Sequence, residues 1–158
     1  MRSGERGFSY LLLLLLLAVL AVATTGSLAL GHAMERRAAE EALLATGEEF
    51  RLALLSWRRG GGTGPGELAE LLRDPRVPGV RRHLRRLPFD PMTGRAEWGL
   101  LRDTGGRIVA VYSLAEGQPI KRDNFDGLRQ AGFEEAESYA RWTFGATPVA
   151  RPASAARN

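Results

Sequence analysis

Residues 1–30 read MRSGERGFSYLLLLLLLAVLAVATTGSLAL, and this stretch decides how the fold is interpreted. A short charged leader precedes 23 uncharged residues, Phe8–Leu30, of which 18 are apolar. As an α-helix, at about 1.5 Å per residue, this segment would be roughly 35 Å long and could cross a hydrocarbon core of about 30 Å. The sequence therefore predicts a transmembrane helix over residues 8–31.

The same segment is open to a second interpretation, as a cleaved secretory signal. Such a signal needs a basic start, an apolar run of about 7–15 residues and small residues at the exit site. Leu11–Leu20 followed by Ala21-Val22-Ala23 meets these needs. On this alternative, signal peptidase releases a soluble periplasmic binding or adaptor domain after Ala23. Arginines flank the segment on both sides, so the positive-inside count does not fix an orientation.

Residues 32–59 keep a helical pattern after the apolar run ends. Apolar side chains such as Met34, Ala38 and Leu52 recur near one face, glutamates lie mainly elsewhere, and no proline interrupts the segment. Five glycines within Gly60–Gly66 then end the helix and form a connector. We expect an amphipathic stalk helix over 32–59, either continuous with the helix over 8–31 or separate from it.

Residues 60–147 are expected to form a globular head of short helices, a β-hairpin and a C-terminal aromatic segment. Glu67–Arg73 is predicted as a short helix. Two strand-like runs, 97–101 and 107–113, flank the loop sequence Asp-Thr-Gly-Gly at 103–106. The fold class expected is α+β, a long N-terminal membrane-spanning helix packed on a small antiparallel sheet. The small and polar residues 148–158 are expected to be disordered.

Residues 73–95 form the most basic stretch, with seven arginines against two aspartates. We interpret its centre, Arg81–Arg86, as the solvated face of a helix anchored by Val80, Leu84 and Leu87. A docking surface for a partner subunit or for phospholipid headgroups is the alternative. Nucleic acid is not expected as a partner, because aromatic residues are not interleaved with the arginines as they are in single-strand binders.

No catalytic constellation is evident in the sequence. The chain has no cysteine and only two histidines, His32 and His83, which lie too far apart for a helical pair. Glutamates cluster at 134–137. Together with the apolar residues Phe133, Ala136 and Ala140 they follow the pattern of an amphipathic helix, in which the glutamates form the solvent-exposed face. We therefore expect no enzyme activity and no cofactor.

A metal site is not expected either. Asp123, Asn124 and Asp126 are the only clustered oxygen donors in the C-terminal region. They lack the central glycine and the fourth carboxylate at fixed spacing that a calcium loop requires. Their expected role is turn and helix-cap chemistry before Leu128.

The junction Arg6-Gly7-Phe8-Ser9-Tyr10-Leu11 resembles the class III leader of type IV pilins and type II secretion pseudopilins. In that family a prepilin peptidase cuts after the glycine and leaves the apolar segment on the mature chain, with a methylated N-terminal phenylalanine. The resemblance implies a leader over 1–7 and a cut between Gly7 and Phe8. The family usually carries a glutamate at the fifth mature position, which is Leu12 here. The resemblance therefore implies a specialised, minor or divergent member.

A second resemblance covers the head. HLRRLPFDPMTGRAEWGLL at 83–101, GGRIVAVYS at 105–113 and the aromatic series that ends at Phe144 resemble the head of pseudopilin-like proteins related to the major type II secretion pseudopilin. In that group a helix, a DPMTG-type turn, a Trp-bearing strand and a Gly-initiated strand follow in this order. The head positions of interest are Asp90, Pro91, Gly94, Trp98, Tyr112 and Trp142.

Together the two resemblances imply a non-enzymatic structural subunit of a type II secretion or type IV pilus assembly. Such a subunit resides in the bacterial inner membrane as a single-pass protein, with its N-terminus in the cytoplasm and its head in the periplasm. It is then packed into a fibre through its N-terminal helix. The implied partners are other pilin or pseudopilin subunits, the prepilin peptidase, the inner-membrane assembly platform and membrane lipid.

Overall fold

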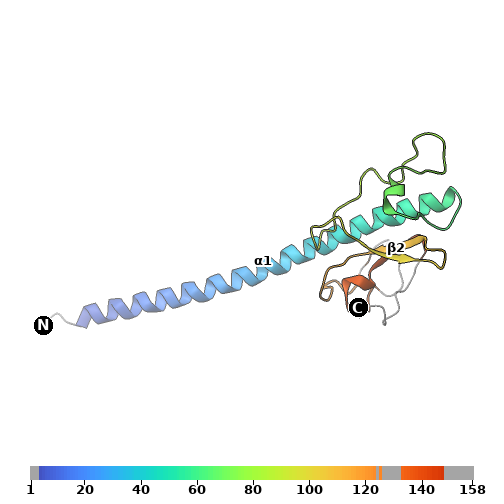
Figure 1. The fold of residues 1–158 in the computed structure, drawn as a ribbon. Coiled ribbons are helices and arrows are strands. Elements are labelled where there is room, and N and C mark those ends of the chain that lie inside the picture. Colours follow the sequence, from blue (N-terminus) through green and yellow to red (C-terminus); the bar gives the residue numbers. More distant parts are fainter. Residues whose placement is uncertain (1–3, 124, 126–132, 148–158) are drawn as a thin grey trace. The chain divides into compact units, whose positions relative to one another are not determined.

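The computed structural model describes residues 4–123, 125 and 133–147 of the chain; within the helical segment 4–30, it describes side chains from Phe8 to Ala21. The chain divides into two compact units, Met1–Arg36 and Arg37–Asn158. The tail predicted at 148–158 lies outside the described residues. The elements, drawn in Figure 1, are the α-helix α1 (Gly4–Arg59), the short 3-10 helices η1 (Leu68–Leu71) and η2 (Tyr139–Arg141), and the strands β1 (Gly99–Arg102), β2 (Ile108–Tyr112) and β3 (Thr143–Gly145).

One uninterrupted helix, α1, covers Gly4–Arg59. No proline interrupts these residues, and their many leucines and alanines favour helix. After the last turn, Gly60 N donates a hydrogen bond of 3.1 Å to Trp57 O. Gly61 and Gly62 then adopt φ angles of +94° and +96°, a region that glycine enters without a steric penalty. The helix therefore ends where the glycine run predicts, and residues 32–59 continue the preceding helix.

The predicted membrane-spanning helix over 8–31 is wrong. Within the described part of the chain, no helix combines the length and the apolar character that a membrane crossing requires. Two further predictions depend on this helix and are wrong for the same reason. They are the fold class with a membrane-spanning helix, and the single-pass inner-membrane location with a cytoplasmic N-terminus and a periplasmic head.

The predicted hairpin is present as β1 and β2. The two strands pair antiparallel, with Gly99 opposite Tyr112 and Leu101 opposite Ala110. The third strand, β3, pairs antiparallel with the other edge of β2, so that the sheet order is β1-β2-β3. The sequence predicts an aromatic segment at β3 but not its pairing, because three residues are too few for an alternation pattern.

The core forms where the C-terminal part of α1 meets the sheet. Gly47 lies at the closest approach, since a Cβ atom at this position would clash with the ring of Phe144 on β3. Ile108 and Val111 of β2 are fully buried in the same cluster. The residues of α1 in this cluster that are at most 2% exposed are Leu43, Phe50, Ala53, Leu54 and Trp57. Their spacing of three to four residues is that of one helix face.

The arginine-rich residues 81–86 are not helical, contrary to the prediction. His83 N and Leu84 N both donate to Leu71 O, at 2.8 and 2.9 Å, instead of to carbonyls four residues earlier in the chain. Val80, expected as an anchor, is 71% exposed, whereas Leu84 is buried as expected. Non-local backbone hydrogen bonds join this segment to η1. The spacing of its apolar residues alone therefore predicts the wrong secondary structure.

The other predicted short helices are reduced to single turns. The segment predicted as a helix over Glu67–Arg73 contains only η1. Residues 134–137 form a turn in which Ala136 N donates to Phe133 O at 3.3 Å, and η2 follows it. Phe133 and Ala136 are nonetheless buried as the pattern predicts. Single 3-10 turns are common connectors and satisfy the same burial over a shorter length.

Candidate functional site

The N-terminal part of α1 carries the longest run of exposed apolar side chains in the described part of the chain. The large apolar side chains from Phe8 to Leu20 are 45–70% exposed. Leu11–Leu17 are seven successive leucines, and they face all sides of the helix because successive residues are about 100° apart. Large exposed apolar surfaces mark interaction sites. This run, residues 8–20, is therefore the candidate interaction segment.

The predicted processing and register positions lie in this segment or next to it. Gly7 lies within α1, and Phe8 is 70% exposed. Leu12, which stands where the resembling family usually has glutamate, is 58% exposed and is flanked by leucines in the sequence. The structure therefore brings these three positions together at one end of α1.

Asp90, Pro91 and Gly94 form a turn that is held within the head. Asp90 is fully buried; its Oδ1 accepts a hydrogen bond from Met92 N at 2.8 Å, and its Oδ2 accepts one from the Ser113 hydroxyl at 2.6 Å. Gly94 has a φ of +69° and donates its N–H to Asp90 O at 2.7 Å. The motif therefore fixes the chain beside the end of β2, and its carboxyl group faces the protein interior.

Trp98, Tyr112 and Trp142 belong to the packing of the head and do not converge on one site. Trp98 is 7% exposed and meets Phe50 of α1 edge to face, with ring centroids 4.9 Å apart. Trp142 is fully buried and stacks on Phe133 at 5.7 Å. Tyr112 is half-buried on β2. These residues thus contribute to the stability of the head.

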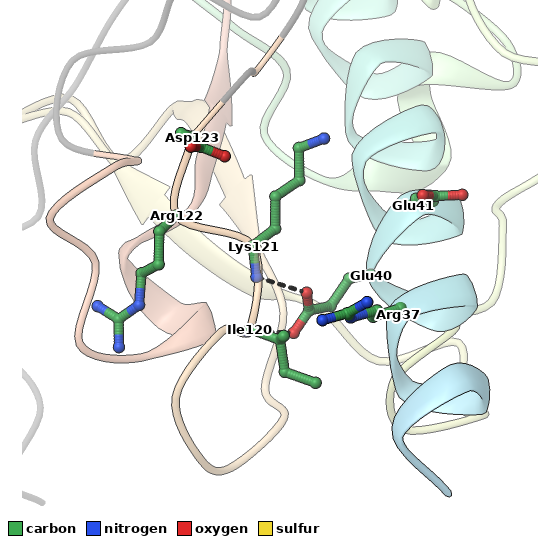
Figure 2. A pocket seen from close by; sticks show the side chains of 7 residues that line it. All are labelled: Arg37, Glu40, Glu41, Ile120, Lys121, Arg122 and Asp123. Carbon is green, nitrogen blue, oxygen red and sulfur yellow. Dashed lines mark hydrogen bonds between the residues drawn. The ribbon is translucent and has the colours of Figure 1, made fainter. Parts of the chain in front are cut away.

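A pocket of about 280 Å³ lies between α1 and residues 120–123, and Figure 2 shows it from close by. Glu40, on α1, is 1% exposed. Its Oε1 accepts hydrogen bonds from Ile120 N at 2.7 Å and from the Tyr139 hydroxyl at 2.6 Å, and its Oε2 accepts one from Lys121 N at 3.0 Å. The other side chains that line the pocket are Arg37, Glu41, Arg122 and Asp123.

The pocket combines cationic and carboxyl groups in equal number, so it has no net preference for a charged ligand. Its one buried carboxyl group, on Glu40, is already engaged by the donors of the chain. Among the described residues, no three His, Cys, Asp or Glu side chains are grouped as a metal would need. Of the clustered oxygen donors considered above, Asp123 is exposed at the pocket, and Asn124 and Asp126 lie outside the described residues. The arrangement therefore acts as a clamp between α1 and the C-terminal part of the head.

We predict that removing one donor of this clamp destabilises the head. Tyr139→Phe keeps the buried ring but leaves Glu40 without its bond to the hydroxyl, and we expect a loss of about 1–2 kcal/mol in the free energy of unfolding. Urea denaturation of the full chain measures it. Tyr10→Phe, at a position 63% exposed, is the control and should change the free energy by less than about 0.5 kcal/mol. Equal stabilities of the two variants would contradict a stabilising role for the hydrogen bond between Tyr139 and Glu40.

A second buried polar cluster, which sequence reasoning missed, closes the end of α1. Asp74 Oδ2 accepts hydrogen bonds from Arg76 Nη2 at 2.8 Å and from the His83 ring at 3.2 Å. The Arg76 guanidinium lies 3.7 Å from the ring centroid of Trp57 and donates to Trp57 O and Gly61 O. Hydrogen bonds from Arg76, and a further one from His83, hold the pKa of Asp74 well below its usual value. The Asp-Pro pair at 74–75 signals a turn, but no local pattern signals these contacts.

Ser56, His83 and Asp74 are the residue types of a hydrolytic triad, but their arrangement differs from one. In such triads the aspartate contacts Nδ1 of the histidine and the serine contacts Nε2. Here Nδ1 lies 2.9 Å from Ser56 Oγ, while Nε2 faces Asp74, and the His83 side chain is fully buried. We assign the cluster a structural role because its histidine is not accessible to a substrate.

We predict that Asp74 makes the stability of the head sensitive to acid. Because the pKa of Asp74 is lowered in the folded state, its contribution is present above the unfolded pKa of about 3.9 and is lost as the pH falls further. Asp74→Asn should be less stable than the parent chain at pH 7, and the difference should narrow between about pH 5 and pH 3. Urea midpoints at pH 7, 5 and 3 measure this, with the exposed Glu116→Gln as control. A difference that is constant with pH would contradict the assignment.

Comparisons of the chain with protein-family models, with curated proteins and with solved structures found no match.

Proposed function

We propose that this chain is a non-enzymatic structural subunit that packs into a fibre through the interaction segment of α1. The observation that supports the proposal is the exposure of the large apolar side chains from Phe8 to Leu20, at 45–70% each. Fully burying a leucine side chain contributes about 1.5–3 kcal/mol relative to leaving it exposed. Covering this segment with neighbouring helices therefore provides a large driving force for association.

The distribution of the apolar side chains favours a fibre core over a two-helix contact. A helix that is apolar on every side has to be buried on every side. One partner covers a single stripe of it, whereas the centre of a helical bundle covers all of them. Ala18 and Ala21, near the end of the run, allow neighbouring helix backbones to approach closely.

The leader resemblance supports the same role. On the proposal, the prepilin peptidase cuts between Gly7 and Phe8, so that the mature chain begins with the interaction segment. Leu12 offers no carboxylate to the N-terminal amine of a neighbour. The subunit therefore enters fibres beside other pilin or pseudopilin subunits that carry the glutamate, as a minor component of a type II secretion or type IV pilus assembly. Inner-membrane anchoring forms no part of this proposal.

The first test is the N-terminus of the mature chain. Intact-mass and N-terminal peptide mass spectrometry of protein from cells that contain a prepilin peptidase should show a chain that begins at Phe8, with a methylated amine. Gly7→Val should block this cut, because the peptidase of the resembling family cuts after glycine. A mature chain that begins at Thr24 would establish the alternative, a soluble binding or adaptor domain released by signal peptidase.

The second test is co-assembly. The chain is expressed with a compatible assembly machinery and with a pseudopilin that carries the fifth-position glutamate, and its incorporation is measured in sedimented fibres. Leu13→Asp places a carboxylate in the interaction segment and should reduce incorporation at least about tenfold, since burying an unpaired charge costs several kcal/mol.

Leu52→Asp is the matched control for Leu13→Asp. Both leucines lie on α1. Leu52 is 53% exposed and Leu13 is 52% exposed, but Leu52 lies outside the interaction segment. The control should incorporate to within about twofold of the parent chain. Equal incorporation of the two variants would contradict packing through the interaction segment.

A further inference from the structure

Four arginines, Arg81, Arg82, Arg85 and Arg86, are displayed by a fixed segment of the head, here called the arginine loop (residues 81–86). All four are exposed, while Leu84 between them is buried. Asp74 N donates to Arg81 O at 2.9 Å, and the backbone of residues 83 and 84 bonds to Leu71 O. The loop is thus held at its start and at its centre, so its backbone needs little further ordering when the arginines bind a partner.

The charge of the arginine loop is not neutralised within the described part of the chain. The ion pairs found there involve Arg51, Arg76 and the two histidines, and none includes an arginine of the loop. Val80 and Phe89, next to the loop in sequence, are 71% and 67% exposed. Arginine and aromatic side chains are enriched at protein–protein contacts, where they supply most of the binding energy. The surface therefore has the composition of an interface for an acidic protein surface.

The same unit also carries an acidic surface. Glu134, Glu135 and Glu137 are exposed on the turn formed by residues 133–137, here called the acidic turn. The buried side chains of Phe133 and Ala136 fix this turn to the core. Among the described residues, no ion pair engages its glutamates.

No described ion pair joins the two surfaces within one copy. Leu84 of the arginine loop and Phe133 of the acidic turn are anchored in one hydrophobic cluster, which holds both segments in place. In Figure 1, the green segment that carries the arginines and the orange-to-red segment that carries the glutamates lie on opposite sides of the C-terminal part of α1. Complementary charges at opposite sides of one unit favour a heterologous contact, which repeats from copy to copy.

We propose that the arginine loop of one copy of this chain docks on the acidic turn of a second copy. The contact is distinct from the helix packing of the proposed function, since none of its residues lies in the interaction segment. It joins successive heads, and its strength falls with salt because most of its charges are exposed.

Site-specific cross-linking tests this contact in the full chain, which contains no cysteine and therefore gives no background. Two copies with different tags, one with R85C and the other with E135C, are co-expressed and oxidised. We expect a disulfide-linked species that carries both tags. R85C paired with E116C is the matched control, because residue 116 is an exposed glutamate outside the acidic turn, and its yield should be at least about fivefold lower.

Charge reversal separates a specific contact from random collision. R86E in the R85C copy should lower the cross-link yield at least about fivefold, and E134R in the E135C copy should restore it. A yield that does not respond to R86E, or one that E134R fails to restore, would overturn the proposal. Cross-linking of R85C copies only to each other would also overturn it, in favour of a symmetric contact. Pull-down of the parent chain by nucleic acid without any cross-link would assign the arginine loop to that ligand instead.

The Leu13→Asp substitution makes failure of this contact distinguishable from failure of the proposed function. If both tagged copies carry this substitution and the cross-link persists while fibres are lost, the head contact forms independently of the helix packing. If fibres form normally and the cross-link is absent, the head contact is wrong and the helix packing stands.

Discussion

The buried carboxyl group of Glu40 holds the two halves of the head together. It lies on α1 and accepts hydrogen bonds from residues 80 to 99 positions later in the chain, on Ile120, Lys121 and Tyr139. A buried polar group without such partners is costly, so Glu40 fixes residues 120 and 121 and the first residue of η2, Tyr139, to α1. The sheet and its aromatic cluster pack against the same helix, α1, to which these hydrogen bonds fix residues 120, 121 and 139.

The sequence predicts the elements of this head better than it predicts the contacts between them. The glycine run ends α1 at Arg59, and the turn at 103–106 joins two strands, because glycine and aspartate impose these conformations locally. The bonds of residues 83 and 84 to Leu71 are non-local, so the amphipathic pattern around the arginines predicts a helix that does not form. The clamp at Glu40 is equally non-local, and in the sequence Glu40 is one of several glutamates on a helix.

The error over the membrane-spanning helix has a different origin. The prediction rests on a count of 23 uncharged residues, whereas no helix in the described part of the chain is long and apolar enough for the crossing. The same leucines are nevertheless exposed and face every side of α1. The apolar run that the sequence singles out is therefore present as exposed helix, and its role in packing stays a prediction.

Two kinds of surface on this chain act over different ranges and therefore suit different steps of an assembly. Burial of apolar surface along α1 contributes a large free energy, but it is non-directional and acts only at contact. Because seven successive residues are leucine, shifting one helix along another changes little of this burial, so it does not fix the register. Charge attraction between the arginine loop and the acidic turn is weaker, but it acts over about a Debye length of 8–10 Å and depends on position. In the proposed fibre, a subunit with leucine at position 12 lacks one means of fixing register within the helix core. The proposed contact between the arginine loop and the acidic turn supplies another, because opposite charges attract only in registers that bring the two surfaces together.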